Sequence, residues 1–225
     1  MILTIGNVKG GVGKTTLAIN FAMGRAMKGR DVLLIDGDEQ GTALTFTELR
    51  AEQTGAHDYT AVALSGAAVR SQVRQLAPKY DDIIIDVGGR DTGSFRAALT
   101  ITDMLLVPVQ PRSFDVWALD QVTTLIEEAR SIHDLKACTV LNAADPVGRD
   151  NAEAAEALRD YPALAYIDAP IIRRKAFPNA AALGRSVFEH TPRDQKAIDE
   201  MAALMAFVYQ DDIKKLPNGY RKETA

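Results

Sequence analysis

The sequence predicts an α/β fold in which a twisted, mainly parallel sheet is covered by helices on both faces. Apolar runs typical of strands alternate with helical patterns along most of the chain. The runs at 32–35 and 83–85 are continuously apolar instead of alternating, which is typical of parallel strands buried on both faces. A glycine-rich segment lies between the first apolar run and the first helical pattern, as a phosphate-binding loop does.

The elements are expected in strict alternation along the chain. The expected strands are 2–8, 31–36, 59–64, 82–87, 104–109, 136–142 and 164–167. The expected helices are 15–28, 42–53, 67–77, 94–101, 116–131 and 149–160, followed by two near 178–184 and 194–209. Gly29 is expected to cap the C-terminus of the first helix, and Asp115 the N-terminus of the helix that begins near residue 116.

Length and composition indicate one ordinary globular domain. The chain has 225 residues, of which 47% are hydrophobic and 25% charged, enough to bury a substantial core. We expect a single domain over residues 1–210 and a polar, flexible C-terminal tail over residues 211–225. Because the first strand begins at residue 2, no helix-turn-helix extension is expected before it.

Other composition features exclude several classes of protein. No apolar stretch approaches the roughly 20 residues that span a bilayer and no signal peptide is evident, so we expect a cytoplasmic protein. Cys138 is the one cysteine, which excludes an internal disulfide and a four-cysteine metal site. The net charge of −4 argues against nucleic-acid binding through bulk charge, so any DNA contact requires a local basic patch.

The segment KGGVGKTT at 9–16 has the chemistry of a phosphate-binding loop. Its glycines allow backbone N–H groups to turn toward phosphate oxygens, and the N-terminus of the following helix adds partial positive charge. Lys14 supplies a full charge to the β- and γ-phosphates, and the Thr15 hydroxyl is placed to bind Mg²⁺. The predicted nucleotide-binding residues of this loop are Gly10, Gly11, Val12, Gly13, Lys14, Thr15 and Thr16.

Carboxylates follow two of the later strands. Asp36 and Asp38 lie at the end of the second expected strand, and Asp86 ends the apolar run IIID of the fourth, which is the Walker B arrangement. Because the C-termini of parallel strands face the ligand crevice, these side chains are expected beside the phosphates. Asp86 is predicted to hold Mg²⁺. For Asp36 and Asp38, capping of the next helix is the alternative.

These motifs resemble those of the ParA/MinD family of P-loop ATPases. In the general loop motif the first glycine would fall at Val8; here it is missing, and a second lysine, Lys9, opens the glycine run as in the deviant loop of that family. The segments at 34–40 (LIDGDEQ), 107–111 (VPVQP) and 186–189 (SVFE) add to the resemblance. The likeness covers residues 1–210 and is greatest to the short ParF-like plasmid partition ATPases.

The resemblance implies a P-loop NTPase fold and a Mg²⁺-dependent ATP hydrolase in which two subunits sandwich two ATP molecules. Lys9 would reach across to the partner's phosphates as a positive group supplied in trans. Asp36 would lie near the Mg²⁺ shell, and Asp38 would position or activate the attacking water. The predicted catalytic residues are Lys9, Lys14 and Asp38, and the predicted metal ligands are Thr15, Asp36 and Asp86.

Three other positions are interpreted through the same family. Asn142 lies where relatives place an asparagine against the adenine edge, and a turn-forming asparagine is the alternative. Glu39 replaces the usual proline, which adds negative charge and loosens the turn around Asp38. Gly88 and Gly89 lie where members often carry two prolines, which favours a more flexible loop near the γ-phosphate.

The resemblance also implies a function, which is plasmid or chromosome partition. An ATP-bound homodimer would coat nucleoid DNA without reading its sequence, and a centromere-binding, ParB-like adaptor protein would trigger hydrolysis and release. The predicted DNA-binding residues are Arg173, Arg174 and Lys175, a dense basic cluster for which a solvated loop is the alternative. No membrane partner is expected.

Three alternative functions stay open. The same ATPase could position another cargo, such as a microcompartment or a conjugation complex. A MinD-like regulator that cycles on a membrane would need a basic amphipathic C-terminal helix, and the helix at 194–209 carries acidic residues on its polar side and is expected to pack on the core. A metabolic P-loop enzyme that activates a small carboxylate would need a second-substrate pocket.

Overall fold

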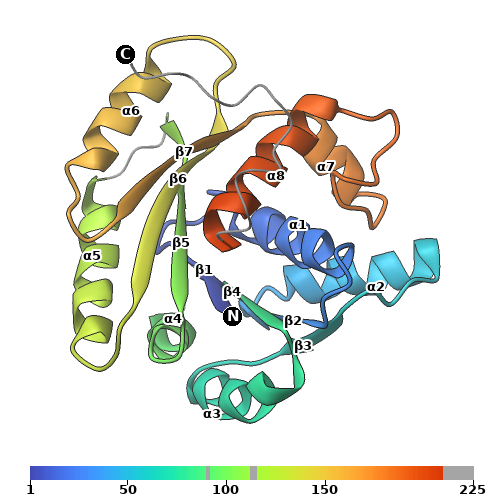
Figure 1. The fold of residues 1–225 in the computed structure, drawn as a ribbon, viewed down its shortest axis with the longest axis horizontal. Helices are drawn as coiled ribbons and strands as arrows, with labels where there is room; N and C mark the ends of the chain where they lie inside the picture. The colour runs from blue at the N-terminus through green and yellow to red at the C-terminus, as the bar shows by residue number, and fades with distance from the viewer. Residues whose placement is uncertain (90–91, 112–115, 210–225) are drawn as a thin grey trace.

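The computed structural model describes residues 1–89, 92–111 and 116–209 (Figure 1). Seven strands form one sheet in the order β3-β2-β4-β1-β5-β6-β7, and every neighbouring pair is parallel. The strands are β1 Ile2–Ile5, β2 Val32–Gly37, β3 Thr60–Ala63, β4 Asp82–Val87, β5 Met104–Val109, β6 Lys136–Ala144 and β7 Ala165–Ile172. The predicted parallel sheet is confirmed.

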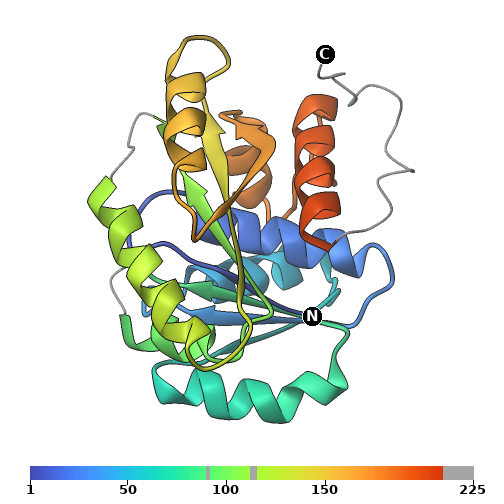
Figure 2. The same cartoon turned by 60° about the vertical axis from the view of Figure 1, so that its left-hand side comes forward.

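Helices cover both faces of this sheet, as Figures 1 and 2 show. One face carries α1 Lys14–Ala26, α2 Thr42–Thr54, α7 Ala176–Ala181 and α8 Gln195–Tyr209. The other carries α3 Ala67–Leu76 with the 3₁₀ turn η1 Ala77–Lys79, α4 Thr92–Leu99, α5 Val116–Arg130 and α6 Asp150–Arg159. The strands divide their side chains between the two layers: Leu33 and Ile35 of β2 pack on one side, and Val32 and Leu34 on the other.

Several boundaries differ from the predicted ones. β1 ends at Ile5 and not at residue 8, because the chain leaves the sheet after Gly6, whose N–H still donates to the carbonyl oxygen of Leu106, and forms the loop. The first helix ends at Ala26 with Met27 as its C-cap, and Gly29 lies three residues beyond the helix with a φ of +74°. β7 extends to Ile172, well beyond the predicted residue 167. The predicted cap Asp115 and the tail at 211–225 lie outside the described residues, and the domain bounds stay a prediction.

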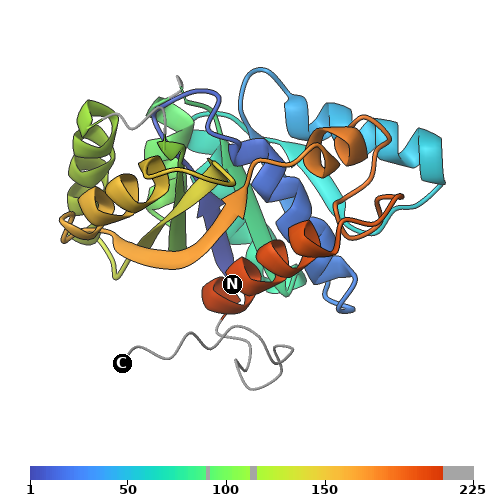
Figure 3. The ribbon, with the colours of Figure 1, turned by 90° about the horizontal axis from the view of Figure 1, so that it is seen from above.

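The C-terminal helix packs on the core. Its apolar side is buried against α1 and β7, and Figure 3 shows α8 lying beside α1. The buried residues of α8 include Ile198, Met201, Leu204, Met205 and Val208. Among the described residues, no helix has the length and apolarity that crossing a membrane requires. The apolar side of α8 is therefore buried in the core of the protein.

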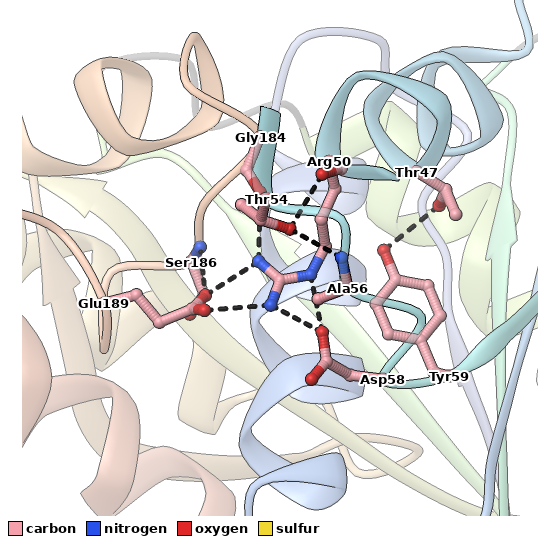
Figure 4. A network of polar contacts seen from close by, with 9 residues as sticks. All are labelled: Thr47, Arg50, Thr54, Ala56, Asp58, Tyr59, Gly184, Ser186 and Glu189. Atoms are coloured by element: carbon pink, nitrogen blue, oxygen red, sulfur yellow. Dashed lines mark hydrogen bonds and ion pairs between the residues drawn. The ribbon is translucent and has the colours of Figure 1, made fainter. Parts of the chain in front are cut away.

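A buried arginine joins α2 to the segment at 184–189 (Figure 4). The Arg50 side chain is 4% exposed and donates hydrogen bonds to Asp58, Glu189 and the carbonyl of Gly184. Glu189 also accepts from the backbone and hydroxyl of Ser186. Burial alone would raise the pKa of Glu189, but the hydrogen bonds from Arg50 and Ser186 outweigh burial and lower the pKa. The SVFE segment thus has a structural role in which an ion pair holds the loop to α2.

Removing this arginine is expected to destabilise the protein. Arg50→Met leaves the Glu189 carboxylate partly buried without its partner, and we expect the free energy of unfolding to fall by about 2–4 kcal/mol. The control Arg74→Met removes an exposed arginine of α3, and its effect is expected to stay within about 0.5 kcal/mol. Urea denaturation measures both. Equal stabilities for the two variants would contradict the role of the network.

The same network has a pH signature with a defined sign. Because the folded-state pKa of Glu189 lies below its unfolded value, its contribution is present above the unfolded pKa and is lost as the pH falls through the folded pKa. Glu189→Gln should therefore reduce the loss of stability that the wild type shows on acidification below about pH 4. If the stability of this variant fell with decreasing pH as steeply as that of the wild type, Arg50 would not lower the pKa of Glu189.

Candidate nucleotide-binding site

The glycine-rich loop leaves β1 at the C-terminal edge of the sheet and enters α1. Gly11 has a φ of +75°, and Gly13, the N-cap of α1, has a φ of +88°. Both values lie in the left-handed region, which residues with a Cβ rarely adopt. Lys14 follows as the first residue of α1. The loop therefore has the strand, loop and helix context that the sequence predicted, with glycine required by conformation at two positions.

Lys14 points back over the loop. Its side chain is largely buried, and Nζ donates a hydrogen bond to the carbonyl oxygen of Lys9 at 2.9 Å. Burial lowers the pKa of Lys14, while the charges of Asp86 and Asp38 act in the opposite direction. The ammonium group thus lies in the field of two acidic side chains, at the point where the sequence predicts the phosphates.

Asp86 is a buried carboxylate without an ordinary hydrogen bond. It is 1% exposed, and neither carboxylate oxygen has a hydrogen-bond partner. Burial raises the pKa of Asp86 to about 7, helped by the charges of Asp36 and Asp38, while Thr15 and Lys14 lower it. The Thr15 hydroxyl is thus near enough to favour the charged carboxylate, although the geometry falls outside that of a hydrogen bond. Such an orphaned oxygen pair is suited to a cation.

Asp36 lies next to Asp86 in the sheet register but has partners of its own. Its two oxygens accept hydrogen bonds from the backbone N–H of Asp38 at 3.2 Å and from that of Leu44 at 2.9 Å. Leu44 belongs to the first turn of α2. Asp36 therefore supports the start of α2, as the alternative interpretation expects, and its role as a metal ligand stays a prediction.

Asp38 lies in a tight turn at the edge of the site. Its side chain accepts from the N–H of Gln40, and its carbonyl oxygen accepts from the N–H of Gly41. The turn is thus closed by two hydrogen bonds even with Glu39 in place of proline, and the Glu39 side chain is exposed. The expectation that Glu39 loosens this turn finds no support in its geometry.

The two glycines after β4 lie in close contact with two of these motifs. A Cβ at Gly88 would lie 2.8 Å from the carboxylate carbon of Asp38. A Cβ at Gly89 would lie 2.9 Å from the backbone nitrogen of Gly10 and 3.0 Å from the carbonyl carbon of Lys9. The glycines therefore provide room where three loops meet.

A pocket of about 270 Å³ extends from the phosphate loop along the ends of β6 and β7. Its lining includes Gly11, Gly13, Thr16, Asn142, Arg174 and Phe177. Asn142 is buried and donates to the carbonyl oxygen of Val12 at 2.7 Å. Its amide is thus engaged with the loop, and its contact with adenine stays a prediction.

The predicted basic cluster is split by an ion pair. Arg174 donates to Glu200 of α8 from Nε at 3.2 Å and from a terminal nitrogen at 2.5 Å. Arg173 and Lys175 are exposed. The three residues therefore do not form one solvated patch: Arg174 is held by Glu200 in the wall of the pocket, Arg173 lines the same pocket from an exposed position, and Lys175 is exposed.

Two residues of the site were not assigned a role from sequence. Asn7, 2% exposed, accepts from the N–H of Lys9 at 2.9 Å and donates to the carbonyl oxygen of Pro108 at 2.9 Å. Gln110 donates to the carbonyl oxygen of Gly11 at 2.8 Å. For Gln110 the available signal is its position directly after an expected strand, because parallel strands end at the ligand edge. Asn7 falls inside the expected strand 2–8, so the sequence offered no such signal for it.

The donor set fits a magnesium ion bound together with a nucleotide. Over residues 1–89, 92–111 and 116–209, no three His, Cys, Asp or Glu side chains gather as a metal site. Mg²⁺ is typically bound in nucleotide enzymes by one or two carboxylates together with phosphates and waters. Asp86, with its orphaned oxygens, and the neighbouring Thr15 hydroxyl meet that description.

Comparison with known proteins adds independent findings. A family model described as an AAA domain matches residues 1–65. The chain is 31% identical over 206 residues to Maintenance of carboxysome distribution protein A of Halothiobacillus neapolitanus, covering 90% of this chain and 94% of that protein. It is 31% identical over 163 residues to the chromosome partitioning protein ParA of Myxococcus xanthus, covering 56% of this chain and 58% of that protein.

The fold is also found in solved structures. A Cyanothece McdA–ATP complex superposes with a TM-score of 0.77 at 17% identity, over 93% of this chain and 96% of that chain. At this identity the likeness extends to the fold alone. The same arrangement of strands and helices thus occurs in a protein whose structure holds ATP.

The unpaired carboxylate of Asp86 is expected to cost stability in the nucleotide-free protein. Because its folded-state pKa of about 7 lies above the ordinary value of 3.8, stability falls as the pH rises between these two values. Asp86→Asn should therefore be more stable than the wild type at about pH 8, on the order of a few kcal/mol, and this advantage should shrink toward about pH 5. Urea denaturation at both pH values measures the difference.

A matched control separates this effect from a general change of charge. Asp134 is exposed, so Asp134→Asn should change stability little at either pH. If the difference between Asp86→Asn and the wild type were the same at both pH values, the carboxylate would titrate in its ordinary range and the site would carry no such cost.

Proposed function

The chain belongs to the ParA/MinD family of P-loop ATPases, and on that premise we propose that it is a ParA-type positioning ATPase. In this cycle ATP joins two copies into a sandwich dimer, the dimer binds DNA without reading its sequence, and a partner protein stimulates hydrolysis and release. ATP must bind the dimer better than the monomer for such a switch to work. ATP and Mg²⁺ are the proposed cofactors.

The main support is the arrangement of the two lysines in the loop. The backbone of Lys9 is fixed from both sides, since its N–H donates to Asn7 and its carbonyl oxygen accepts from Lys14. Its side chain is half-buried beside the exposed Gly10, at the rim of the loop. A rigid base at the rim suits a lysine that acts on the nucleotide of a second copy, as an arginine finger does.

The roles of the acidic residues follow from their surroundings. Asp38 is half-buried against Gly88, next to the loop after β4, where it would orient the attacking water. Lys14 would exchange its bond to Lys9 for the phosphates. Mg²⁺, held with Asp86 and Thr15, would supply neutralisation of the phosphate charge. We propose Asp36 as a support for this group, through its bonds to Asp38 and Leu44.

For DNA binding we propose Arg173 and Lys175, the exposed members of the cluster. Arg174, which the sequence grouped with them, is held by Glu200 and has a structural role in this proposal. Each phosphate contact adds to a salt-dependent affinity, so two weak patches become effective once a dimer joins them. This explains how a chain with a net charge of −4 would bind DNA in one nucleotide state only.

Two cargoes remain candidates. The leading interpretation from sequence is a plasmid or chromosome with a ParB-like adaptor. A protein compartment is the second candidate, because the similarity to the carboxysome distribution protein covers nearly the whole of both chains, whereas that to the chromosome partitioning protein covers little more than half. A membrane-cycling role receives less support, because the apolar side of α8 is buried.

The DNA-binding proposal predicts binding to a non-specific duplex with ATP and not with ADP or without nucleotide. Arg173→Ala/Lys175→Ala should weaken binding and reduce the slope of log affinity against log salt by about 0.9 for each lost phosphate contact. The control Arg70→Ala/Arg74→Ala removes the same charge from the exposed side of α3 and should leave the slope unchanged. Fluorescence anisotropy measures all three proteins, and equal binding in every nucleotide state would overturn the switch.

Deleting the gene in its own host distinguishes the cargoes. A partition role predicts loss of a replicon at division, with compartments evenly spaced. A compartment role predicts clustered compartments and stable replicons. Fluorescence microscopy of both cargoes in the same cells measures the outcome, and normal placement of both would contradict the two assignments together.

A further inference from the structure

We propose that Gln110 and Asn142 are positioning residues that hold the phosphate loop in its binding conformation before a nucleotide arrives. The two carboxamides come from the C-terminal ends of β5 and β6, far from the loop in sequence. Gln110 donates to the carbonyl oxygen of Gly11, and Asn142 donates to that of Val12. This inference deepens the proposed function, because it rests on the loop binding a nucleotide.

The direction of these two bonds determines where the loop's donors point. A carbonyl oxygen only accepts, so each carboxamide must present its NH₂ group to the loop. In a planar trans peptide the C=O of one residue and the N–H of the next point in opposite directions. Holding the carbonyls of Gly11 and Val12 toward Gln110 and Asn142 therefore turns the N–H groups of Val12 and Gly13 to the other side. Successive N–H groups aligned in this way form an anion-binding concavity.

An irregularity in β6 supports the same role for Asn142. The register between β6 and β7 shifts on both sides of Asn142, as in a β-bulge, and the next residue, Ala143, has a φ of +50°. A bulge re-aims a side chain, and the left-handed conformation is unfavourable for alanine. Gly13 makes room for the result, since a Cβ there would lie 2.3 Å from Asn142 Nδ2. The strained end of β6 thus directs Asn142 to the loop, and the absence of a side chain at Gly13 leaves space for its hydrogen bond to Val12.

These two supports differ from the third contact on the loop. Lys14 Nζ donates to the carbonyl oxygen of Lys9, and this bond would be given up when the ammonium turns to the phosphates. The bonds from Gln110 and Asn142 involve neutral side chains that need not move when the anion binds. A loop ordered in advance loses less conformational entropy on binding, which raises affinity without adding a contact to the ligand.

A test must separate this role from a contact between Asn142 and adenine. The variants are Gln110→Met and Asn142→Leu, which keep the approximate size of each side chain and remove the amide, with Gln121→Met on the exposed side of α5 as the matched control. Calorimetry measures the dissociation constants of three probes with each protein: Mg-ATP, Mg-tripolyphosphate, which has no base, and adenosine, which has no phosphate.

The loop role predicts weaker binding of both phosphate probes. Each variant should lose about three- to tenfold in affinity for Mg-ATP and for Mg-tripolyphosphate alike, as expected for the loss of one hydrogen bond, while adenosine and the control stay unchanged. Unchanged affinity for both phosphate probes would overturn the inference. If Asn142→Leu instead weakened Mg-ATP and adenosine but not Mg-tripolyphosphate, its amide would bind the base.

Hydrogen exchange provides a second readout that needs no ligand. In the nucleotide-free protein, the amides of Val12 and Gly13 should exchange faster in both variants at an unchanged unfolding midpoint, and unchanged exchange would overturn the inference. This readout remains decisive even if the wild type binds no ATP, an outcome that would refute the proposed function separately. Should Asn142→Leu not fold, Gln110→Met, at a partly exposed side chain, decides the question alone.

Discussion

The burial of charge at one edge of the parallel sheet is the constraint on which the rest of the structure depends. Lys14, Asp36 and Asp86 are each at least nine-tenths buried there, and Asp86 has no hydrogen bond to offset the loss of water. Burying a charge without full compensation is costly, so this edge lowers the stability of the fold. Two apolar layers, one on each face of the sheet, offset that cost and hold the charged groups in place.

The same edge joins the parts that a nucleotide switch must connect. Gly89 touches the backbone of Lys9 and Gly10, and Gly88 touches Asp38. The loop after β4 therefore packs directly against the backbone of the phosphate loop at Gly89 and against the Asp38 carboxylate of the turn after β2 at Gly88. A displacement of the loop after β4 is therefore expected to move the phosphate loop and Asp38, because close packing leaves little space to absorb it. This is the physical basis for a site that would respond to the presence of a γ-phosphate.

The sequence was informative where a single segment carries the signal. The buried strands β4 and β5 were predicted at their observed bounds, because continuous apolar runs and the polar residues that end them are local features. The loop conformation at Gly11 and Gly13 followed from the motif in the same way. β7 was predicted too short, because Pro170 and the polar Asp168 interrupt its apolar pattern while the backbone still pairs with β6.

Contacts between distant segments could not be predicted from local patterns. Arg174 pairs with Glu200, so it is no longer part of the DNA patch that the sequence predicts. The hydrogen bond from Asn142 to Val12 accompanies a bulge in β6 that no residue type in this strand predicts. The SVFE segment was recognised, but its link from Glu189 to Arg50 spans 139 positions. Such pairs are decided by how the strands and helices are ordered in space, which becomes known only with the sheet topology.

The central claim is that ATP joins two copies of this chain through Lys9, and sedimentation velocity tests it most directly. The wild type should sediment as a monomer without nucleotide and with Mg-ADP, and as a dimer with Mg-ATP under conditions of slow hydrolysis. Lys9→Ala should remain monomeric with Mg-ATP although it still binds the nucleotide. A wild type that stays monomeric with bound Mg-ATP, or a Lys9→Ala variant that dimerises as the wild type does, would contradict the account.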